Sequence, residues 1–286
     1  MVFSGVMGKE GARSGWNKAW SAMNHRELFH KLMHYQGADR MPVVHWAAWP
    51  ETMERWYREG LPRDRDIHTV LGTTPHWRGI GANVGLYPPF DEMTFEENEE
   101  SRVYRDANGV TCQAWKKKSN IPHYIDFTLK TPRDWETHYR WRLQPDPKRV
   151  PADLPAQSER CRASGLPVAF WTGSLMGWIR DWMGVENLAY FMYDHPDVFS
   201  EMVRTIADLV CWAADQVLPH LQVDMGFGWE DICGRSGPFV SPALFRKCVA
   251  PGYRKIREKL EQYGIPLYGV DSDGDGAEAQ GLAGNP

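Results

Sequence analysis

Two short segments near the end of the chain constrain its fold most, because each is an apolar run of strand length that stops in carboxylates. The runs are Asp224–Asp231 and Leu267–Gly274, and one long helical pattern separates them. Strands that alternate with helices are typical of the β/α units of a parallel sheet, and in parallel barrels the carboxyl ends of the strands carry the chemistry. We therefore expect one rim to collect the acids that end the two runs, which are Glu230, Asp231, Asp271 and Asp273.

The composition allows one sizeable domain and excludes several classes of partner. The chain has 286 residues, of which 42% are hydrophobic and 24% charged, so it can bury a substantial core. A formal net charge of -4 gives no basic field for nucleic acid. No stretch of the sequence approaches the roughly 20 apolar residues that span a bilayer, so we expect no membrane partner.

The five cysteines form no CxxC pair and are odd in number. This pattern favours a reducing compartment over a disulfide framework or a self-contained zinc knuckle. Residues 1–22 lack the apolar core of a secretory signal. We therefore predict a cytoplasmic protein and interpret 1–22 as a disordered tail or an over-extended start.

The N-terminal part of the ordered region should alternate helix and strand. Asn24 is placed to cap a helix from His25 to about Tyr35, and Met41–Trp46 has the pattern of the first barrel strand. Shorter helices are expected over Glu51–Glu59 and Asp66–Leu71.

The segment from 99 to 128 has a different, β-rich character. Two strand patterns, Arg102–Arg105 and Val110–Trp115, flank the turn sequence Asp106–Gly109, which predicts a hairpin. A third strand is expected at Tyr124–Phe127. We interpret this insertion as an antiparallel flap beside the barrel.

The alternation then resumes with a strand at Leu166–Trp171 and a helix at Leu175–Met183. The longest helix is predicted from Asp194 to about His220, and the next opens at Ser241-Pro242 and reaches Tyr263. A last strand, Pro266–Val270, follows. The expected fold class is therefore α/β, with a (β/α)8-type barrel and an inserted antiparallel flap.

A series of motifs, in order and spread over residues 23–275, resembles the uroporphyrinogen decarboxylase superfamily. No single motif is specific, but their order and spacing carry the resemblance. It implies a TIM barrel and a family that also contains cobalamin-dependent methyltransferases. The motifs are Asn24-His25-Arg26-Glu27 with Asp39-Arg40-Met41-Pro42-Val43, Arg105–Val110, Thr131–Trp135, Gly184–Leu188, Asp194-His195-Pro196, Trp229-Glu230-Asp231 with Gly237-Pro238 and Ser241-Pro242, and Asp271–Gly274.

The first predicted strand departs from the decarboxylase pattern, in which an arginine-rich segment follows it. Here the corresponding place is His45–Glu51, where the Pro-Glu end matches and the arginines are missing. Without bidentate arginines a polyanionic porphyrinogen loses its main charge-assisted hydrogen bonds. We expect His45 to contact substrate or move a proton, unless it is a structural group, and expect an apolar pocket lined by Trp46, Trp49 and Trp171.

The thiol methyltransferase branch of the family binds zinc through an H-x-C-G segment. In this sequence Asp271 and Asp273 stand in place of the His and Cys, which disfavours a zinc-thiolate centre. Together with Glu230 they could instead hold a hard divalent cation or polarise a substrate directly. The structural alternatives are that Asp271 or Asp273 caps a helix, or that Glu230 or Asp231 pairs with Arg235.

Methyl transfer with a corrinoid (cobalamin) protein as partner is the function that the resemblance implies first. Glu230, Asp271 and Asp273 would then orient the substrate or a metal, with Asp231 in support. Decarboxylation of a carboxylated substrate is the alternative within enzymes. A third hypothesis is that the chain is inert and acts at most as a binding or assembly module.

The end of the sequence suggests a truncation. A full barrel has eight β/α units in roughly 250 residues, and the pattern stops after about six, so about 60 residues would be missing. Residues 276–286 have no barrel periodicity and read as a non-family tail. An unclosed barrel exposes strand edges, which favours a homo-oligomer or aggregation.

Overall fold

The computed structural model describes residues 23–38, 40–45, 48–117, 119, 121–234 and 237–271. The chain divides into two compact units, one formed by the segment up to Arg78 with Glu159–Val168, the other by Gly79–Ser158 with the segment from Ala169 onward. The tails expected at 1–22 and 276–286 lie outside the described residues. A single barrel domain over 23–275 stays a prediction.

The first unit contains three short helices that begin where the sequence indicates. In α1 (His25–Met33), Asn24 and Glu27 form a reciprocal capping box, in which each side chain accepts from the other residue's backbone amide. Helix α2 (Pro50–Arg58) starts at a proline. Asp66 caps α3 (Ile67–Leu71). Side-chain capping thus sets the start of α1 and α3, and a proline sets the start of α2.

The predicted first barrel strand is wrong over its described residues. Between 41 and 45 the structure has only one parallel bridge, from Val44 to Thr74. Met41 and Val43 are 72% and 62% exposed, so this apolar run has no buried face to hold it in a sheet. Pro42 also lacks the amide that a strand would donate.

A parallel sheet forms the centre of the second unit, with the strand order β1 (Arg78–Ile80), β6 (Val168–Gly173), β7 (Met225–Trp229) and β10 (Tyr268–Asp271). Strands β6, β7 and β10 run parallel. The apolar runs of β6 and β7 are almost entirely buried, as expected for strands covered on both faces. The α/β class is confirmed, whereas closure of the sheet into a barrel stays a prediction.

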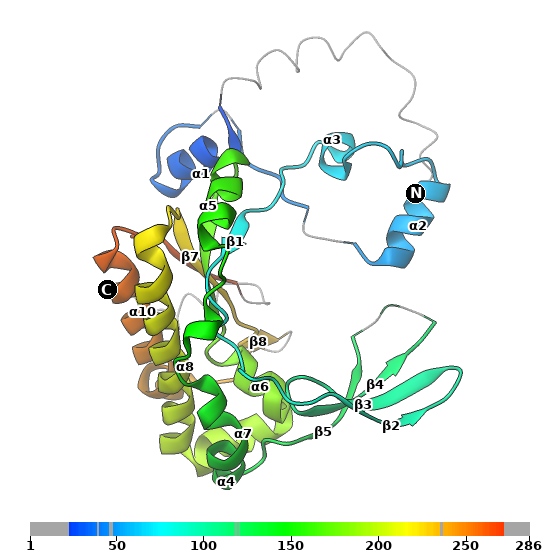
Figure 1. Cartoon of the computed structure of the whole chain (residues 1–286), viewed down its shortest axis with the longest axis vertical. Helices are drawn as coiled ribbons and strands as arrows, with labels where there is room; N and C mark the ends of the chain where they lie inside the picture. Colours follow the sequence, from blue (N-terminus) through cyan, green and yellow to red (C-terminus); the bar gives the residue numbers. More distant parts are fainter. Residues whose placement is uncertain are drawn as a thin grey trace. The chain divides into compact units, whose positions relative to one another are not determined.

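Two long helices, α8 (Pro196–Val217) and α10 (Ala250–Gln262), lie side by side next to the sheet (Figure 1). A Cβ placed on Gly226 would meet Leu260 of α10 at 2.4 Å, so glycine lets this helix approach β7 closely. Tyr253 of α10 faces Tyr268 of β10 with ring centroids 6.2 Å apart. The face of the sheet that carries Gly226 and Tyr268 is therefore the helix-covered face.

The predicted flap is present as a four-stranded antiparallel sheet in the order β2 (Met93–Glu97), β3 (Ser101–Arg105), β4 (Val110–Trp115) and β5 (His123–Phe127). The sequence reading missed β2. Gly109 closes the β3–β4 turn with a φ of 82°, a conformation that favours glycine. The hydroxyl of Tyr139 donates to the carbonyl of Asn108 at 2.9 Å and anchors this turn.

The remaining elements connect these layers, and none of the described helices is long and apolar enough to cross a membrane. The helix predicted from Asp194 to about His220 is present as α8 followed by η5, and it is separate from α7 because Pro196 lacks the amide needed to continue α7. The elements that connect the layers are α4 (Pro132–Asp134), η2 (Trp135–Tyr139), η3 (Arg140–Leu143), η4 (Pro147–Arg149), α5 (Leu154–Ala163), α6 (Gly177–Met183), α7 (Val185–Asp194), η5 (Leu218–His220), β8 (Cys233–Gly234), β9 (Gly237–Pro238), α9 (Pro242–Leu244) and η6 (Phe245–Val249).

Candidate functional site

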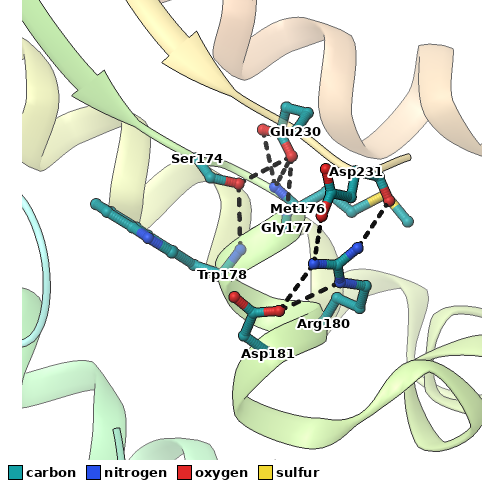
Figure 2. Close-up of polar contacts among 8 residues, drawn as sticks. All are labelled: Ser174, Met176, Gly177, Trp178, Arg180, Asp181, Glu230 and Asp231. Carbon is teal, nitrogen blue, oxygen red and sulfur yellow. Dashed lines mark hydrogen bonds and ion pairs between the residues drawn. The ribbon is translucent and has the colours of Figure 1, made fainter. Parts of the chain in front are cut away.

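Glu230 follows β7 directly and is only 1% exposed. Its carboxylate lies at the start of α6, where helical amides have no partner within the helix (Figure 2). Ser174 Oγ donates to it at 2.9 Å and the amide of Gly177 at 2.7 Å. Further hydrogen bonds come from the amides of Leu175 and Met176 and from the hydroxyl of Tyr253.

These donors occupy the acceptor capacity of Glu230. Burial raises the pKa of this carboxyl, while the hydrogen bonds from Tyr253 and from the three amides act in the opposite direction. A carboxylate has about four lone-pair sites, and five groups already donate to this one. Glu230 therefore does not fit the role of a metal ligand, and its geometry is that of a group that holds α6 against β7.

Asp231 instead belongs to an ion cluster with Arg180 and Asp181. Arg180 Nη2 lies 2.8 Å from Asp231 Oδ2 and 2.9 Å from Asp181 Oδ1, so one guanidinium joins two carboxylates (Figure 2). The carboxylate side chains are 34% and 35% exposed, whereas that of Arg180 is 17% exposed. The cluster thus carries a net negative charge that solvent can reach at the carboxyl end of β7.

The carboxyl of Asp181 is subject to two opposed electrostatic effects. Burial raises the pKa of Asp181, although the hydrogen bond and charge of Arg180 lower it. The Arg180 guanidinium also lies 5.8 Å from the centre of the Trp229 ring, which gives the cluster an aromatic wall. Asp181 is thus the carboxyl of the cluster that retains its proton to a higher pH than an ordinary aspartate.

Aromatic side chains follow the sheet face opposite α10. Trp171 is paired with Phe227 in the β6–β7 register, and their ring centroids are 6.1 Å apart. Trp229 lies two residues further along β7 and shares this face. Half-buried Trp171 is therefore part of an apolar stripe that leads to the Asp231 cluster, and its predicted contact with substrate stays a prediction.

Asp271 ends β10 beside Trp229 in the parallel register. It is exposed, and its backbone carbonyl accepts the amide of Glu230. The Glu230 carboxylate is bonded to the start of α6 and to Tyr253 of α10, and its gathering at one rim with the carboxylate of Asp271 stays a prediction. Catalytic roles for Glu230, Asp231 and Asp271 stay predictions, and Asp273 lies outside the described residues.

The other predicted substrate contacts belong to the first unit. The ring of His45 lies 6.0 Å from that of Trp56 and 6.2 Å from that of His68. Trp49 precedes α2 and is 52% exposed. Trp46 lies outside the described residues. Roles of these side chains in binding substrate stay predictions.

Sequence reasoning missed four residues that build this site, namely Ser174, Arg180, Asp181 and Tyr253. Ser174 could have been found, because it lies between the apolar run of β6 and a predicted helix. Arg180 and Asp231 are 51 positions apart, so no local pattern indicates their contact. Arg235, which was considered as a partner of Asp231, lies outside the described residues, and within them Asp231 pairs with Arg180.

The divalent cation considered for the acidic rim has no assembled ligand set in the part of the chain that the structure describes. No group of three or more His, Cys, Asp or Glu residues there could hold a metal ion. With Glu230 engaged by protein donors, Asp271 is the remaining described member of the predicted ligand set.

Comparisons with known proteins find a likeness among solved structures. No protein-family model matches the sequence, and no curated protein matches it. Among solved structures, a methyltransferase from Methanosarcina mazei is similar, with a TM-score of 0.49 and 11% identity. The likeness covers 88% of this chain and 71% of that chain.

Proposed function

We propose that this chain is an enzyme of the uroporphyrinogen decarboxylase superfamily type that transfers a methyl group, with a corrinoid protein as its partner. The reaction would take place at the carboxyl ends of β6, β7 and β10. One observation carries the proposal: the Asp231–Arg180–Asp181 cluster stands where an apolar aromatic stripe reaches that edge of the sheet. The ordered sequence motifs around Trp229-Glu230-Asp231 add to it.

The arrangement suits a small substrate with a methyl group on a heteroatom. Trp171, Phe227 and Trp229 offer apolar surface for the methyl group, and the cluster offers polar groups for the heteroatom. When the bond between carbon and heteroatom breaks, its electron pair stays on the heteroatom, which needs a proton. The proton would come from solvent through Asp181, a carboxyl whose pKa burial raises. The corrinoid of the partner is the second substrate, to or from which the methyl group passes.

The cluster supports methyl transfer over decarboxylation. Binding a carboxylated substrate calls for a guanidinium that is free to form a bidentate pair. Arg180 is already bonded to Asp181 and Asp231, so its fork is occupied from within the protein. Decarboxylation is therefore the weaker proposal for this edge of the sheet.

A spectroscopic assay tests the proposal. The purified chain is mixed with cob(I)alamin and, in turn, with methanol, a methylamine, a methyl thioether and a methoxyarene, while absorbance follows the formation of methylcobalamin. One substrate class should be turned over above the protein-free rate. Asp231→Asn should lower that rate by at least about tenfold, because the cluster loses a charge that positions Arg180.

The matched control is Asp197→Asn, which changes an aspartate at the start of α8 away from the cluster. Its rate should equal that of the unaltered chain. Turnover of none of the four substrates, together with release of carbon dioxide from a carboxylated porphyrinogen, would replace methyl transfer by decarboxylation.

A further inference from the structure

The second unit has a cavity of about 500 Å³ whose lining shares no residue with the Asp231 cluster. It lies between the middle of α8 and the segment from Glu136 to Pro145. Leu143 and Leu209 line it and are each 1% exposed, so its floor is apolar and rigidly packed. Trp141, which also lines it, is 48% exposed, and the guanidinium of Arg142 lies over one face of its ring, 4.2 Å from the centre.

The acids that line this cavity are already paired. Arg140 Nη1 lies 2.9 Å from Glu136, and its Nε lies 3.1 Å from Glu201. Asp208 forms an ion pair with Lys255 of α10. A cationic ligand would therefore have to displace a cation that the protein itself supplies.

Arg204 is the charged lining residue that remains once the ion pairs of the others are counted. It lies on α8 among the lining residues and is exposed, and it has no ion-pair partner among the described residues. A guanidinium presents parallel N–H donors that match a carboxylate bidentately. The lining charge without an ion-pair partner is thus the guanidinium of Arg204, whose parallel donors match a planar anion.

We propose that this cavity is a second ligand site, separate from the sheet edge, and that it binds a planar aromatic carboxylate. Arg204 holds the carboxylate, Trp141 stacks on the ring, and Leu143 and Leu209 form the apolar floor. The volume falls in the range of roughly 300–1,000 Å³ that small-molecule sites occupy. This inference does not depend on the methyl-transfer proposal.

Titration of the 286-residue chain with 2-naphthoate tests the inference, by calorimetry and by quenching of tryptophan fluorescence. We expect saturable binding at one site. Arg204→Gln and Trp141→Ala should each weaken it by about tenfold or more, because each removes one of the two recognition contacts. Arg204→Lys should lie between, since it keeps the charge but loses the bidentate fork.

Two controls make the outcome decisive. Arg254→Gln changes an exposed arginine of α10 that does not line the cavity, and it should leave the affinity within about twofold. The uncharged analogue 2-naphthylmethanol should bind at least about tenfold more weakly than 2-naphthoate. Lack of saturable binding, equal affinities of the Arg204→Gln and Arg254→Gln variants, or equal affinities of the two probes would each overturn the inference. Circular dichroism of each variant confirms that it folds.

Discussion

Tyr253 in α10 donates a hydrogen bond to the carboxylate of Glu230, the residue that follows β7. The same carboxylate accepts three backbone amides at the start of α6. One buried side chain therefore ties a strand end to two helices. This arrangement makes Glu230 a structural support for the edge of the sheet where the Asp231 cluster lies.

Glu230→Gln should strongly destabilise the fold. The glutamine amide would place N–H donors against N–H donors, and the negative charge that the start of α6 attracts would be lost. We expect the free energy of unfolding to fall by about 3 kcal/mol, as measured by urea denaturation. Glu258→Gln, on an exposed position of the same α10, should change it by less than about 0.5 kcal/mol. Similar values for the two variants would contradict the supporting role.

Gly228→Ala should also be costly, because β6 and β7 approach closely at this point. An added Cβ would lie 2.6 Å from the carbonyl oxygen of Gly173 and 2.7 Å from Thr172 Oγ1. Since one of these atoms belongs to the backbone, the strands must separate, at a cost of about 2 kcal/mol in unfolding free energy. Gly79→Ala in β1 is the matched control, because its Cβ would meet no atom within 4 Å. Equal melting temperatures of the two variants would refute the close approach.

Asp134 and Thr131 form a capping box at α4, and this predicts a dependence of stability on pH. Burial alone would raise the pKa of Asp134, but hydrogen bonds from the Thr131 hydroxyl and from the amides of Thr131 and Lys130 lower it overall, below 3.8. The contribution of the carboxylate is therefore complete above pH 3.8 and is lost as the pH falls through the lower folded-state value.

At pH 7 Asp134→Ala should lower the free energy of unfolding by about 1 kcal/mol. The difference between this variant and the unaltered chain should shrink as the pH falls towards 3. Urea denaturation at several pH values measures it. A difference that stays constant with pH would show that the carboxylate charge is not what stabilises the cap.

Arg180→Gln should change the titration of Asp181. Without the guanidinium, this carboxyl loses the charge that favours its ionised form, so its pKa should rise further. Carbon-detected NMR of the carboxyl groups reports this directly. The rate of the proposed methyl transfer should fall by at least about tenfold, because Asp181 and Asp231 lose the group that positions them. An unchanged titration of Asp181 would show that the ion pair does not form in solution.

The helices, strands and turns that neighbouring residues in the sequence determine could be predicted from the sequence. The capping pair Asn24 and Glu27 marks the start of α1, and Asp106–Gly109 marks the turn of the β3–β4 hairpin. The apolar runs that became β6, β7 and β10 were found as strands because buried parallel strands are continuously apolar. The strand expected at 41–46 failed because apolar character alone does not provide a neighbouring strand.

Tertiary structure decided what the acidic residues do. The sequence by itself determined that strands end in carboxylates at Glu230, Asp231 and Asp271, since that is a matter of local order. It did not determine that Glu230 turns to the amides of α6 while Asp231 pairs with Arg180, because these partners come from other parts of the chain. A side chain's role depends on the donors and charges within a few ångströms of it, and only the packing of β7 against α6 and α10 brings those groups into place.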